Sequence, residues 1–234
     1  MPFNFKNEKC LPSHVAFIMD GNRRWAKKKG LSPVEGHKIG SNVVKKIVKT
    51  SIELKIKYLT FFSFSTENWN RKKTEVKELH DLLDFYLDSE VDNFIENKIN
   101  FRVIGDLKKF EFGIKKKILK LQEITASFNK LFLVLALSYG SRSEILNAVN
   151  NIKKKSLMNI TEEDINKNLM TKNFPDPDLV IRTSGEMRLS NFLLWQIAYS
   201  ELYFTKTLWP EFNSQKYMIA LRNYIARKRR FGGD

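Results

Sequence analysis

The sequence predicts a single α/β domain, residues 1–234, with a mostly parallel central sheet flanked by helices. Two observations lead to this prediction. Short apolar runs alternate with longer amphipathic stretches along the 234 residues, and neither a Pro- or Gly-rich linker nor an internal repeat divides them. Hydrophobic residues make up 42% of the chain, so it can build a sizeable core. In sheets of this kind, ligands bind at the carboxyl ends of the strands.

The expected strands are brief and rich in apolar, β-branched and aromatic residues. The first, VAFIM, is wholly apolar, as suits a strand buried on both faces. YLTFFSFS and LFLVLALS follow the same pattern, and FRVI and LVIR are shorter versions of it. In chain order, strands are predicted at Val15–Met19, Tyr58–Ser65, Phe101–Ile104, Leu131–Ser138 and Leu179–Arg182.

The expected helices have apolar residues at intervals of three and four positions. Thr74 is the predicted cap of the second helix. The Phe-rich stretch Leu82–Ile95 within that helix is compatible either with core packing or with the lining of a site for a long apolar ligand. In chain order, helices are predicted at Val34–Leu54, Thr74–Asn97, Phe112–Phe128, Ser141–Lys154 and Ser214–Arg230.

The charge balance favours an anionic partner. The chain has 41 Lys and Arg against 26 Asp and Glu, a net charge of +15, which suits nucleic acid, an acidic membrane surface or phosphorylated substrates. One cysteine excludes an intrachain disulfide, and three histidines argue against a zinc site. The first ten residues lack the apolar core of a signal peptide, so we expect a cytoplasmic protein that at most rests on a membrane surface.

A lone carboxylate among cations follows the first expected strand. Asp20 ends the apolar run, and Gly21, Asn22, Arg23 and Arg24 come next. The glycine allows a sharp turn, Asn22 can begin a helix, and the arginines offer forked donors to phosphate oxygens. Asp20 either pairs with an arginine or holds Mg²⁺, which commonly binds one or two carboxylates together with substrate phosphates.

Polar residues also follow the second and fifth expected strands. Arg182 ends the fifth strand, and Arg188 and Ser190 follow on a loop, which together suggest a second phosphate site. Glu201 stands among apolar neighbours and needs a cationic partner or a metal. The loop after the second strand, STENWNR, is polar and contains a Trp. Neither a P-loop nor a G-x-G-x-x-G motif is present.

Several ordered blocks of the chain resemble the cis-prenyltransferases, and within them the bacterial undecaprenyl diphosphate synthases. These blocks are HVAFIMDGNRRWAKKKG, GHKIG, FSFSTENWNR, LSYGSRSEI, LVIRTSGEMRLSNFLLWQ and YSELYFTKTLWPEF, and the similarity extends from about His14 to Gly233. The resemblance implies repeated cis condensation of isopentenyl diphosphate onto farnesyl diphosphate, Mg²⁺, a homodimer and an apolar tunnel. It also implies undecaprenyl diphosphate, the carrier lipid of cell-wall synthesis, as the product, with peripheral membrane contact for its release.

The resemblance also implies roles for particular residues. Asp20 matches a catalytic, metal-linked aspartate, Asn68 a residue that assists proton removal, and Glu201 a second metal ligand, in its own subunit's site or its partner's. The loop that holds the allylic diphosphate is matched by Gly21, Asn22, Arg23 and Arg24, with His37 and Arg71 as helpers. Flanking aromatics of the site are matched by Trp25 and Trp69, and a mobile loop over the substrate by Ser65, Thr66 and Glu67. Matches to the isopentenyl diphosphate site are Arg182, Arg188, Leu189 and Ser190, and Arg230–Gly232 match a C-terminal motif that reaches the partner's site.

Some positions depart from the family pattern. Arg23 and Ser184 replace glycines common in relatives, Pro33 replaces an arginine, Met187 replaces a frequent histidine, and Glu211 replaces an aspartate. Two other classes of function stay open. A nucleic-acid-binding protein would explain the net charge, although no module of that kind is present. An aspartyl phosphotransferase would use Asp20, although Asn22 stands where a second Asp is usual.

Overall fold

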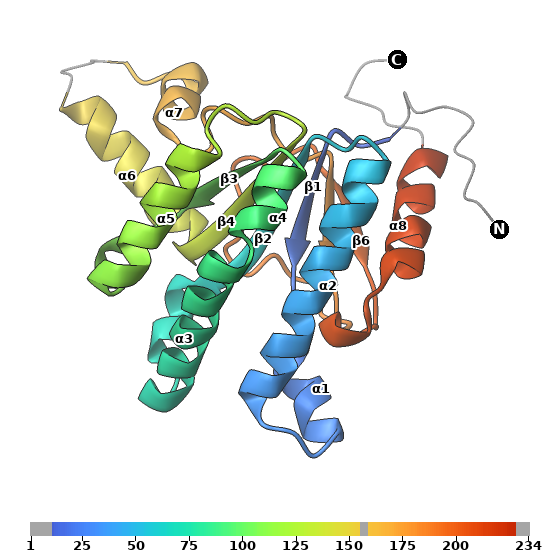
Figure 1. Ribbon diagram of the computed structural model, residues 1–234. Coiled ribbons are helices and arrows are strands. Elements are labelled where there is room, and N and C mark those ends of the chain that lie inside the picture. Colours follow the sequence, from blue (N-terminus) through green and yellow to red (C-terminus); the bar gives the residue numbers. More distant parts are fainter. Residues whose placement is uncertain (1–10, 155–158, 228–234) are drawn as a thin grey trace.

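The computed structural model describes residues 11–154 and 159–227 and confirms the predicted parallel α/β fold. A six-stranded sheet has the order β3-β4-β2-β1-β5-β6, and every neighbouring pair is parallel. The strands therefore all point the same way, and β1 runs towards α1 in Figure 1. The strands are β1 (His14–Ile18), β2 (Tyr58–Ser65), β3 (Ile99–Ile104), β4 (Leu131–Tyr139), β5 (Leu179–Arg182) and β6 (Glu201–Phe204).

Helices return the chain from the carboxyl end of one strand to the amino end of the next in every connection except the one between β5 and β6, where the described residues 183–200 contain no helix. Short 3₁₀ turns, η2 (Thr66–Asn70), η3 (Leu107–Lys109) and η4 (Trp209–Glu211), lie in the connections. The α-helices are α1 (Asn22–Lys28), α2 (Pro33–Glu53), α3 (Lys73–Ser89), α4 (Val91–Glu96), α5 (Phe112–Ile124), α6 (Ser141–Lys153), α7 (Glu162–Asn168) and α8 (Ser214–Ala226).

The two faces of the sheet are buried under different layers. Val15 and Phe17 of β1 face a large core formed with α2, α3, α4, α5 and α8, which lie together on one side in Figure 1. Ala16 and Ile18 face a smaller cluster that includes Phe192. This alternation follows from the two-residue period of a strand. The second face is thus covered in part by an irregular segment, where we expected helices.

The structure corrects several predicted boundaries. The edge strand β6 was not predicted, because its residues ELYF begin with a charged side chain and contain no β-branched residue, unlike the equally short LVIR. The expected helix Thr74–Asn97 is two helices, α3 and α4, separated at Glu90, whose carboxylate pairs with Lys45 of α2 at 2.5 Å. Helix α3 begins at Lys73 after Lys72, so Thr74 is not its cap. Residues 228–230 of the last predicted helix lie outside the described residues.

The GHKIG block brings α1 and α2 close together. A Cβ added at Gly36 would lie 2.5 Å from the carbonyl oxygen of Asn22, and one added at Gly40 would lie 2.3 Å from Oδ1 of Asn22. The two glycines are four residues apart and share one face of α2. Asn22, the first residue of α1, can therefore be buried directly against this face, which fixes the loop that follows β1.

Candidate active site

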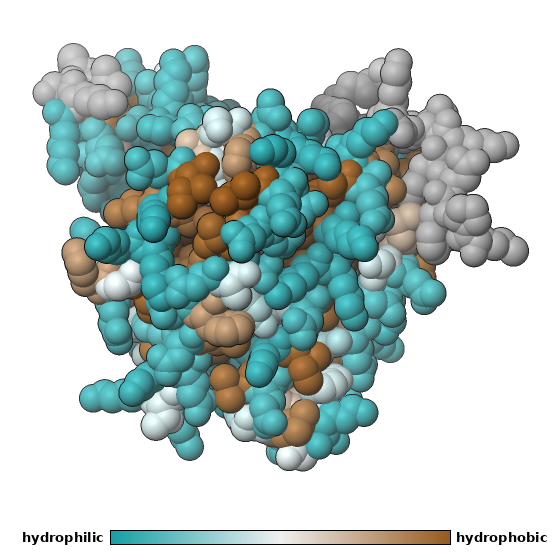
Figure 2. Space-filling view, viewed as in Figure 1, coloured by the Kyte–Doolittle hydropathy of each residue, from teal (hydrophilic) through white to brown (hydrophobic). Residues whose placement is uncertain are grey.

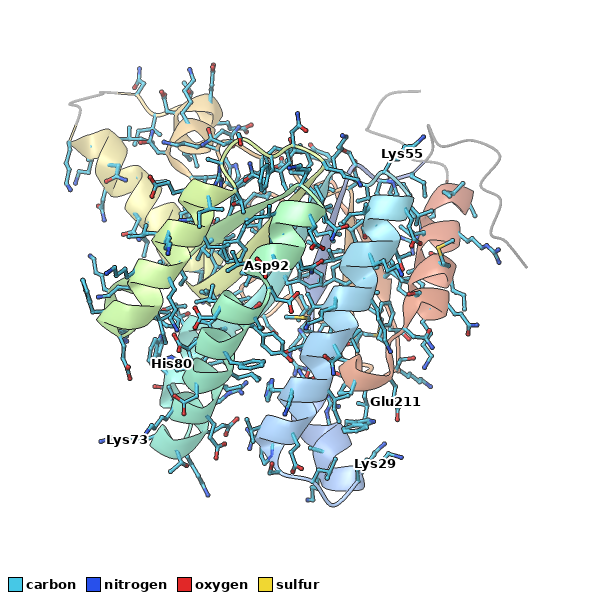
Figure 3. All side chains as sticks on the ribbon, viewed as in Figure 1. Lys29, Lys55, Lys73, His80, Asp92 and Glu211 are labelled. Atoms are coloured by element: carbon cyan, nitrogen blue, oxygen red, sulfur yellow. The ribbon has the colours of Figure 1, made fainter. Side chains whose placement is uncertain are left out.

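Polar side chains gather at the carboxyl ends of β1, β2 and β5, which are neighbours in the sheet. Residues that follow adjacent parallel strands meet at one edge, so Asp20 after β1 comes close to Arg182 at the end of β5. In Figure 3, the labelled Lys29 and Glu211 lie towards this end of the molecule, near α1, and Lys55 lies at the opposite end.

Asp20 links two arginines from different elements. Its Oδ2 accepts a hydrogen bond from Nη2 of Arg182 at 2.9 Å, and its Oδ1 lies 3.4 Å from Nη2 of Arg24. Burial on its own raises the pKa of Asp20. Hydrogen bonds with Arg182 and Ser184, with the charges of Arg182 and Arg24, outweigh burial and lower the pKa from 3.8. Asp20 is therefore an ionised carboxylate at neutral pH.

Arg182 is buried and fixed on three sides. Only 4% of its side chain is exposed. Its Nη1 donates to Oγ of Ser190 at 2.8 Å and to the carbonyl oxygen of Arg188, and its Nε is buried without a partner. Burying a cation is costly unless it is paired, so Asp20 is needed for this arrangement. The unpartnered Nε is a donor available to an anion.

The predicted isopentenyl diphosphate residues come together only in part. Ser190 and the backbone of Arg188 contact Arg182, but the Arg188 side chain is 61% exposed and pairs with Glu186. Leu189 packs against the smaller core cluster. Arg188 thus extends into solvent from a loop whose backbone is tied to the end of β5.

The turn after β1 requires its glycine. Gly21 has φ = +113°, a conformation that side chains rarely adopt, and a Cβ there would lie 2.9 Å from Cδ2 of Leu208. Asn22 is buried, and its Oδ1 has no partner. Trp25 donates its indole N–H to Oε1 of Glu211 at 3.1 Å, which ties α1 to η4.

A second cationic group lies between α1, α2 and α3. Oε1 of Glu75 pairs with Nη1 of Arg71 at 3.0 Å and lies 3.6 Å from Nε of Arg23. Burial, followed by the charges of Arg71 and Arg23, lowers the pKa of His37 to about 4. His37 is therefore neutral, and its buried Nε2 has no partner. Glu75 was missed in the sequence because a glutamate in the first turn of a helix is ordinary.

The loop after β2 is anchored to β4 and to the loop after β5. Oδ1 of Asn68 accepts from the backbone N–H of Ser65 at 3.1 Å, and Thr66 begins η2. Trp69 donates to Oγ of Ser138 at 2.9 Å and packs against an aromatic cluster. Glu67 accepts from Nδ2 of Asn191 at 3.2 Å.

Asn191 is a further residue that the sequence did not single out. Its carbonyl oxygen and Oδ1 accept backbone N–H groups of Ser141 (2.8 Å) and Arg142 (2.9 Å), and its Nδ2 reaches Glu67. This explains the LSYGSRSEI block, because a Cβ at Gly140 would lie 2.7 Å from Nδ2 of Asn191. Asn191 has φ = +62°, a conformation that Asn adopts more often than most residues. Only its position in a loop could have indicated this residue from the sequence.

An apolar pocket of about 190 Å³ leads away from these polar groups. It begins at Met19, Asn22 and His37, and it continues between α2 and α3 over β2 and β4 to Phe101 and Leu121. Ser63 lines it, but Ala136 is fully buried in the other core cluster. The hydrophobic residues visible in Figure 2 gather around α4, between α5 and α2, and Asn93 and Phe94 of α4 line the pocket.

Glu201 lies far from Asp20 in the same chain. Register pairs Glu201 with Leu179, and Leu179 with Val15, so Glu201 is level with Val15 at the amino end of the strands. Asp20 follows five residues later, about 16 Å further along the strand direction. Within residues 11–154 and 159–227, no group of three or more His, Cys, Asp or Glu side chains could hold a metal. Glu201 pairs instead with Nη1 of Arg227 at 2.5 Å.

The positions that depart from the family pattern have structural explanations in part. Pro33 is the exposed first residue of α2 and lies within the capping box of Ser32 and Glu35, so a proline suits this helix start. Met187 is 77% exposed. Ser184 contacts both Arg24 and Asp20.

The chain is similar to known proteins over nearly its whole length. Residues 18–232 match the family model described as putative undecaprenyl diphosphate synthase. An isoprenyl transferase of Fusobacterium nucleatum is 52% identical, covering 97% of this chain and 98% of the relative, and one of Thermotoga maritima is 49% identical, covering 95% and 97%. A ditrans,polycis-undecaprenyl-diphosphate synthase of Buchnera aphidicola, specific for (2E,6E)-farnesyl diphosphate, is 44% identical, covering 100% and 95%.

Solved structures agree with this likeness. The lavandulyl diphosphate synthase of Lavandula x intermedia, in complex with dimethylallyl diphosphate, has a TM-score of 0.93 at 37% identity and covers 96% of this chain and 100% of that one. A probable undecaprenyl diphosphate synthase from Campylobacter jejuni has a TM-score of 0.81 at 36% identity, covering 95% and 99%.

Proposed function

Because this chain belongs to the undecaprenyl diphosphate synthase family of cis-prenyltransferases, we propose that the site around Asp20 binds two diphosphates and joins their apolar chains. The enzyme condenses isopentenyl diphosphate repeatedly onto farnesyl diphosphate and makes undecaprenyl diphosphate. We propose that residues 1–234 act as one domain for this purpose, with its core at about 14–233. The observation that carries the proposal is Asp20 held between Arg24 and Arg182.

The reaction needs stabilisation of negative charge on one diphosphate. The bond between the allylic carbon and its diphosphate oxygen breaks, and the diphosphate leaves with the electron pair. The double-bond electrons of isopentenyl diphosphate form the new carbon–carbon bond, and a proton leaves the isopentenyl unit. Arg24, with Arg23 and Arg71, supplies fixed positive charge where the leaving group becomes more negative.

The isopentenyl diphosphate binds on the other side of Asp20. The buried Nε of Arg182 has no protein partner, and Arg188 and Ser190 lie on the loop beside it. Asp20 holds the two arginine groups together and so brings the two substrates close, which supplies a large part of the rate gain. An amide is a poor base, so Asn68 orients groups while Asp20 or an oxygen of the departing diphosphate accepts the proton.

The donor set fits Mg²⁺ bound through substrate. Asp20 is ionised and 29% exposed, and one carboxylate with diphosphate oxygens is a usual set of Mg²⁺ ligands. When bound, Mg²⁺ neutralises charge on the diphosphate. Glu201 joins this site only from a partner subunit, because within one chain it lies at the other end of the sheet.

This assignment of Glu201 requires a homodimer with shared sites, which we propose and which is testable by complementation. Asp20→Ala and Glu201→Ala are each expected to be inactive. In a mixed dimer, one site keeps both wild-type residues if Glu201 acts on the partner's site. Mixing the two inactive proteins should then restore part of the activity. No recovery, with mixed dimers verified by two affinity tags, would contradict the shared site.

The apolar pocket is the proposed tunnel for the growing chain. It begins beside Asn22 and His37 and continues to Phe101 and Leu121, and its walls are mostly apolar. Leu83, Leu87 and Phe94 of the Phe-rich stretch 82–95 line this pocket, which supports a role of the stretch in binding the chain. Leu87 and Phe94 also belong to the large hydrophobic core, so the stretch packs the core as well.

The finished lipid has to reach a membrane, and α5 offers a suitable surface. Phe112 and Leu119 of this helix are 77% and 60% exposed, beside the exposed Lys116 and Lys120. Apolar side chains among lysines suit the surface of an anionic bilayer. Among the described helices, none has the length and apolar character needed to span a membrane. We propose a cytoplasmic enzyme in peripheral contact with the inner face of the membrane, with no nucleic-acid partner.

The direct test is to incubate the protein with farnesyl diphosphate, labelled isopentenyl diphosphate and Mg²⁺, and to size the lipid. We expect a C55 product with cis double bonds that disappears when EDTA is added. A short product would favour the second candidate function, a cis-prenyltransferase of different product length. The structural similarity to lavandulyl diphosphate synthase supports this candidate. Failure to elongate, with nucleic acid retained in a salt-sensitive way, would contradict the proposal.

A further inference from the structure

Ser184 has a backbone conformation that its side chain disfavours. It lies two residues after β5 with φ = +80°, and Gly185 beside it also has φ = +80°. This left-handed region is easily reached by Gly and is costly for a residue with a Cβ. The backbone N–H groups of Ser184 and Gly185 donate to the carbonyl oxygens of Thr207 (2.7 Å) and Thr205 (2.8 Å), which hold the turn in place.

The side chain of Ser184 contacts both charged groups at the centre of the site. Its Oγ accepts from Nη2 of Arg24 at 2.5 Å, and its carbonyl oxygen accepts from Nη1 of the same guanidinium at 3.3 Å. Its side chain also interacts with the carboxylate of Asp20 and helps to lower the pKa of that carboxyl group. A hydroxyl has one donor and two acceptor positions, so it can bond both partners at once. Ser184 as a whole is only 8% exposed, so water competes little for these bonds.

Arg24 depends on this support more than Arg182 does. Its side chain is 47% exposed and comes from a short helix. Its remaining contacts are ion pairs with Asp20 at 3.4 Å and with Glu186 at 3.3 Å, and pairs at such exposure hold a side chain weakly. The Oγ and the carbonyl oxygen of Ser184 are the acceptors that fix the two terminal nitrogens of the Arg24 guanidinium. An arginine fixed in advance loses less freedom when it binds a diphosphate.

We propose that Ser184 is a positioning residue that orients Arg24 towards the allylic diphosphate and that its strained backbone is retained for this purpose. Strain of this kind is concentrated at functional sites. The inference rests on the proposed function for the identity of the substrate. The competing explanation is structural: the hydroxyl only stabilises the turn, and Arg24 is placed by other groups.

Two substitutions separate the backbone from the hydroxyl. Ser184→Gly removes the hydroxyl and the strain together, whereas Ser184→Ala removes the hydroxyl and keeps the strain. Both should raise the KM for farnesyl diphosphate by about tenfold or more, the loss expected for one hydrogen bond to a charged group. The KM for isopentenyl diphosphate should change less than about twofold, since Arg182 is placed by other partners. Ser184→Gly should melt at a higher temperature than Ser184→Ala.

Lys55→Gly is the matched control for the backbone. Lys55 is also left-handed, with φ = +57°, and Figure 3 shows it at the end of the molecule opposite Lys29. This substitution should leave both KM values unchanged. A changed KM in Lys55→Gly would show that relief of strain alone alters substrate binding, and it would overturn the inference.

The coupling to Arg24 is tested by titration calorimetry with inorganic pyrophosphate, which does not require turnover. Ser184→Ala should weaken pyrophosphate binding by about tenfold in the wild-type background and have no further effect in an Arg24→Ala background. Equal affinities of wild type and Ser184→Ala would overturn the inference, as would the same loss with and without Arg24. A wild-type enzyme that fails to elongate farnesyl diphosphate would refute the proposed function, and the titration would still decide the role of Ser184.

Discussion

The two arginines that contact Asp20 are held in opposite ways. Arg182 ends a central strand, has 4% of its side chain exposed and bonds to Asp20, Ser190 and the backbone of Arg188. Arg24 lies on a short helix, is 47% exposed and is fixed by Ser184 and ion pairs. The proposed isopentenyl side of the site is therefore built into the sheet, and the proposed allylic side is carried by helices on its surface. Substitutions on the buried side should affect folding and binding together, and those on the exposed side should affect binding alone.

The largest expected effect comes from Asp20, which joins the two sides. Asp20→Ala should lower elongation by at least about a hundredfold, as expected for loss of a group that positions transition-state charge. It also leaves Arg182 buried without its carboxylate, so the melting temperature should fall, with circular dichroism still showing a folded protein. Radiolabelled elongation assays measure the first effect. Asp20→Asn, which keeps the shape, is the control, and wild-type activity in either protein would refute the account.

The next largest effect is the difference in stability lost when each of the two arginines is substituted. Arg182→Ala should reduce the free energy of unfolding by about 3 kcal/mol, because it removes one partner of a buried ion pair. Arg24→Ala should change it by less than about 1 kcal/mol, as is usual for an exposed pair. Urea denaturation measures both. Equal losses would mean that the two sides are not held differently.

The role of the pocket can be tested separately from that of the polar site by measuring the length of the lipid product. Ser63 lies on β2 and lines the pocket, so Ser63→Phe should fill part of it and shorten the main product while elongation continues. Thin-layer chromatography of the dephosphorylated lipids measures the length. Ser89→Phe, at an exposed position at the end of α3, should leave the product unchanged. An unchanged product in Ser63→Phe would show that the chain grows elsewhere.

The smallest effect concerns His37 and pH. Burial, with the charges of Arg71 and Arg23, lowers its pKa from 6.5 to about 4. Between these values the unfolded chain binds the extra proton, so this residue makes the protein less stable as pH falls from 6.5 towards 4. We compare the unfolding free energy of His37→Gln with that of wild type at two pH values. The difference, mutant minus wild type, should be about 2 kcal/mol more favourable to the mutant at pH 5 than at pH 7.5. Denaturant titrations at both pH values test this, and a pH-independent difference would contradict it.

Much of this architecture could be predicted from the sequence, because parallel strands buried on both faces are continuous apolar runs. Strands Tyr58–Ser65 and Leu179–Arg182 have the predicted bounds. The break at Glu90 could not be predicted, because neither a Pro nor a Gly marks it in the sequence. Asp20, Arg24 and Arg182 could be placed together because they follow adjacent strands. Glu75 and Asn191 could not, because their partners come from other elements and their own sequence settings are ordinary.

The central claim is that Asp20 separates two diphosphate subsites, and substrate-specific kinetics of two variants test it most directly. With Mg²⁺ present, initial rates of Arg24→Ala and Arg182→Ala are measured while each substrate is varied in turn. The account predicts that Arg24→Ala raises the KM for farnesyl diphosphate by about tenfold or more, and that Arg182→Ala does so for isopentenyl diphosphate. If each substitution raised both KM values equally, or if the two effects were exchanged, the assignment of the two sides would be wrong.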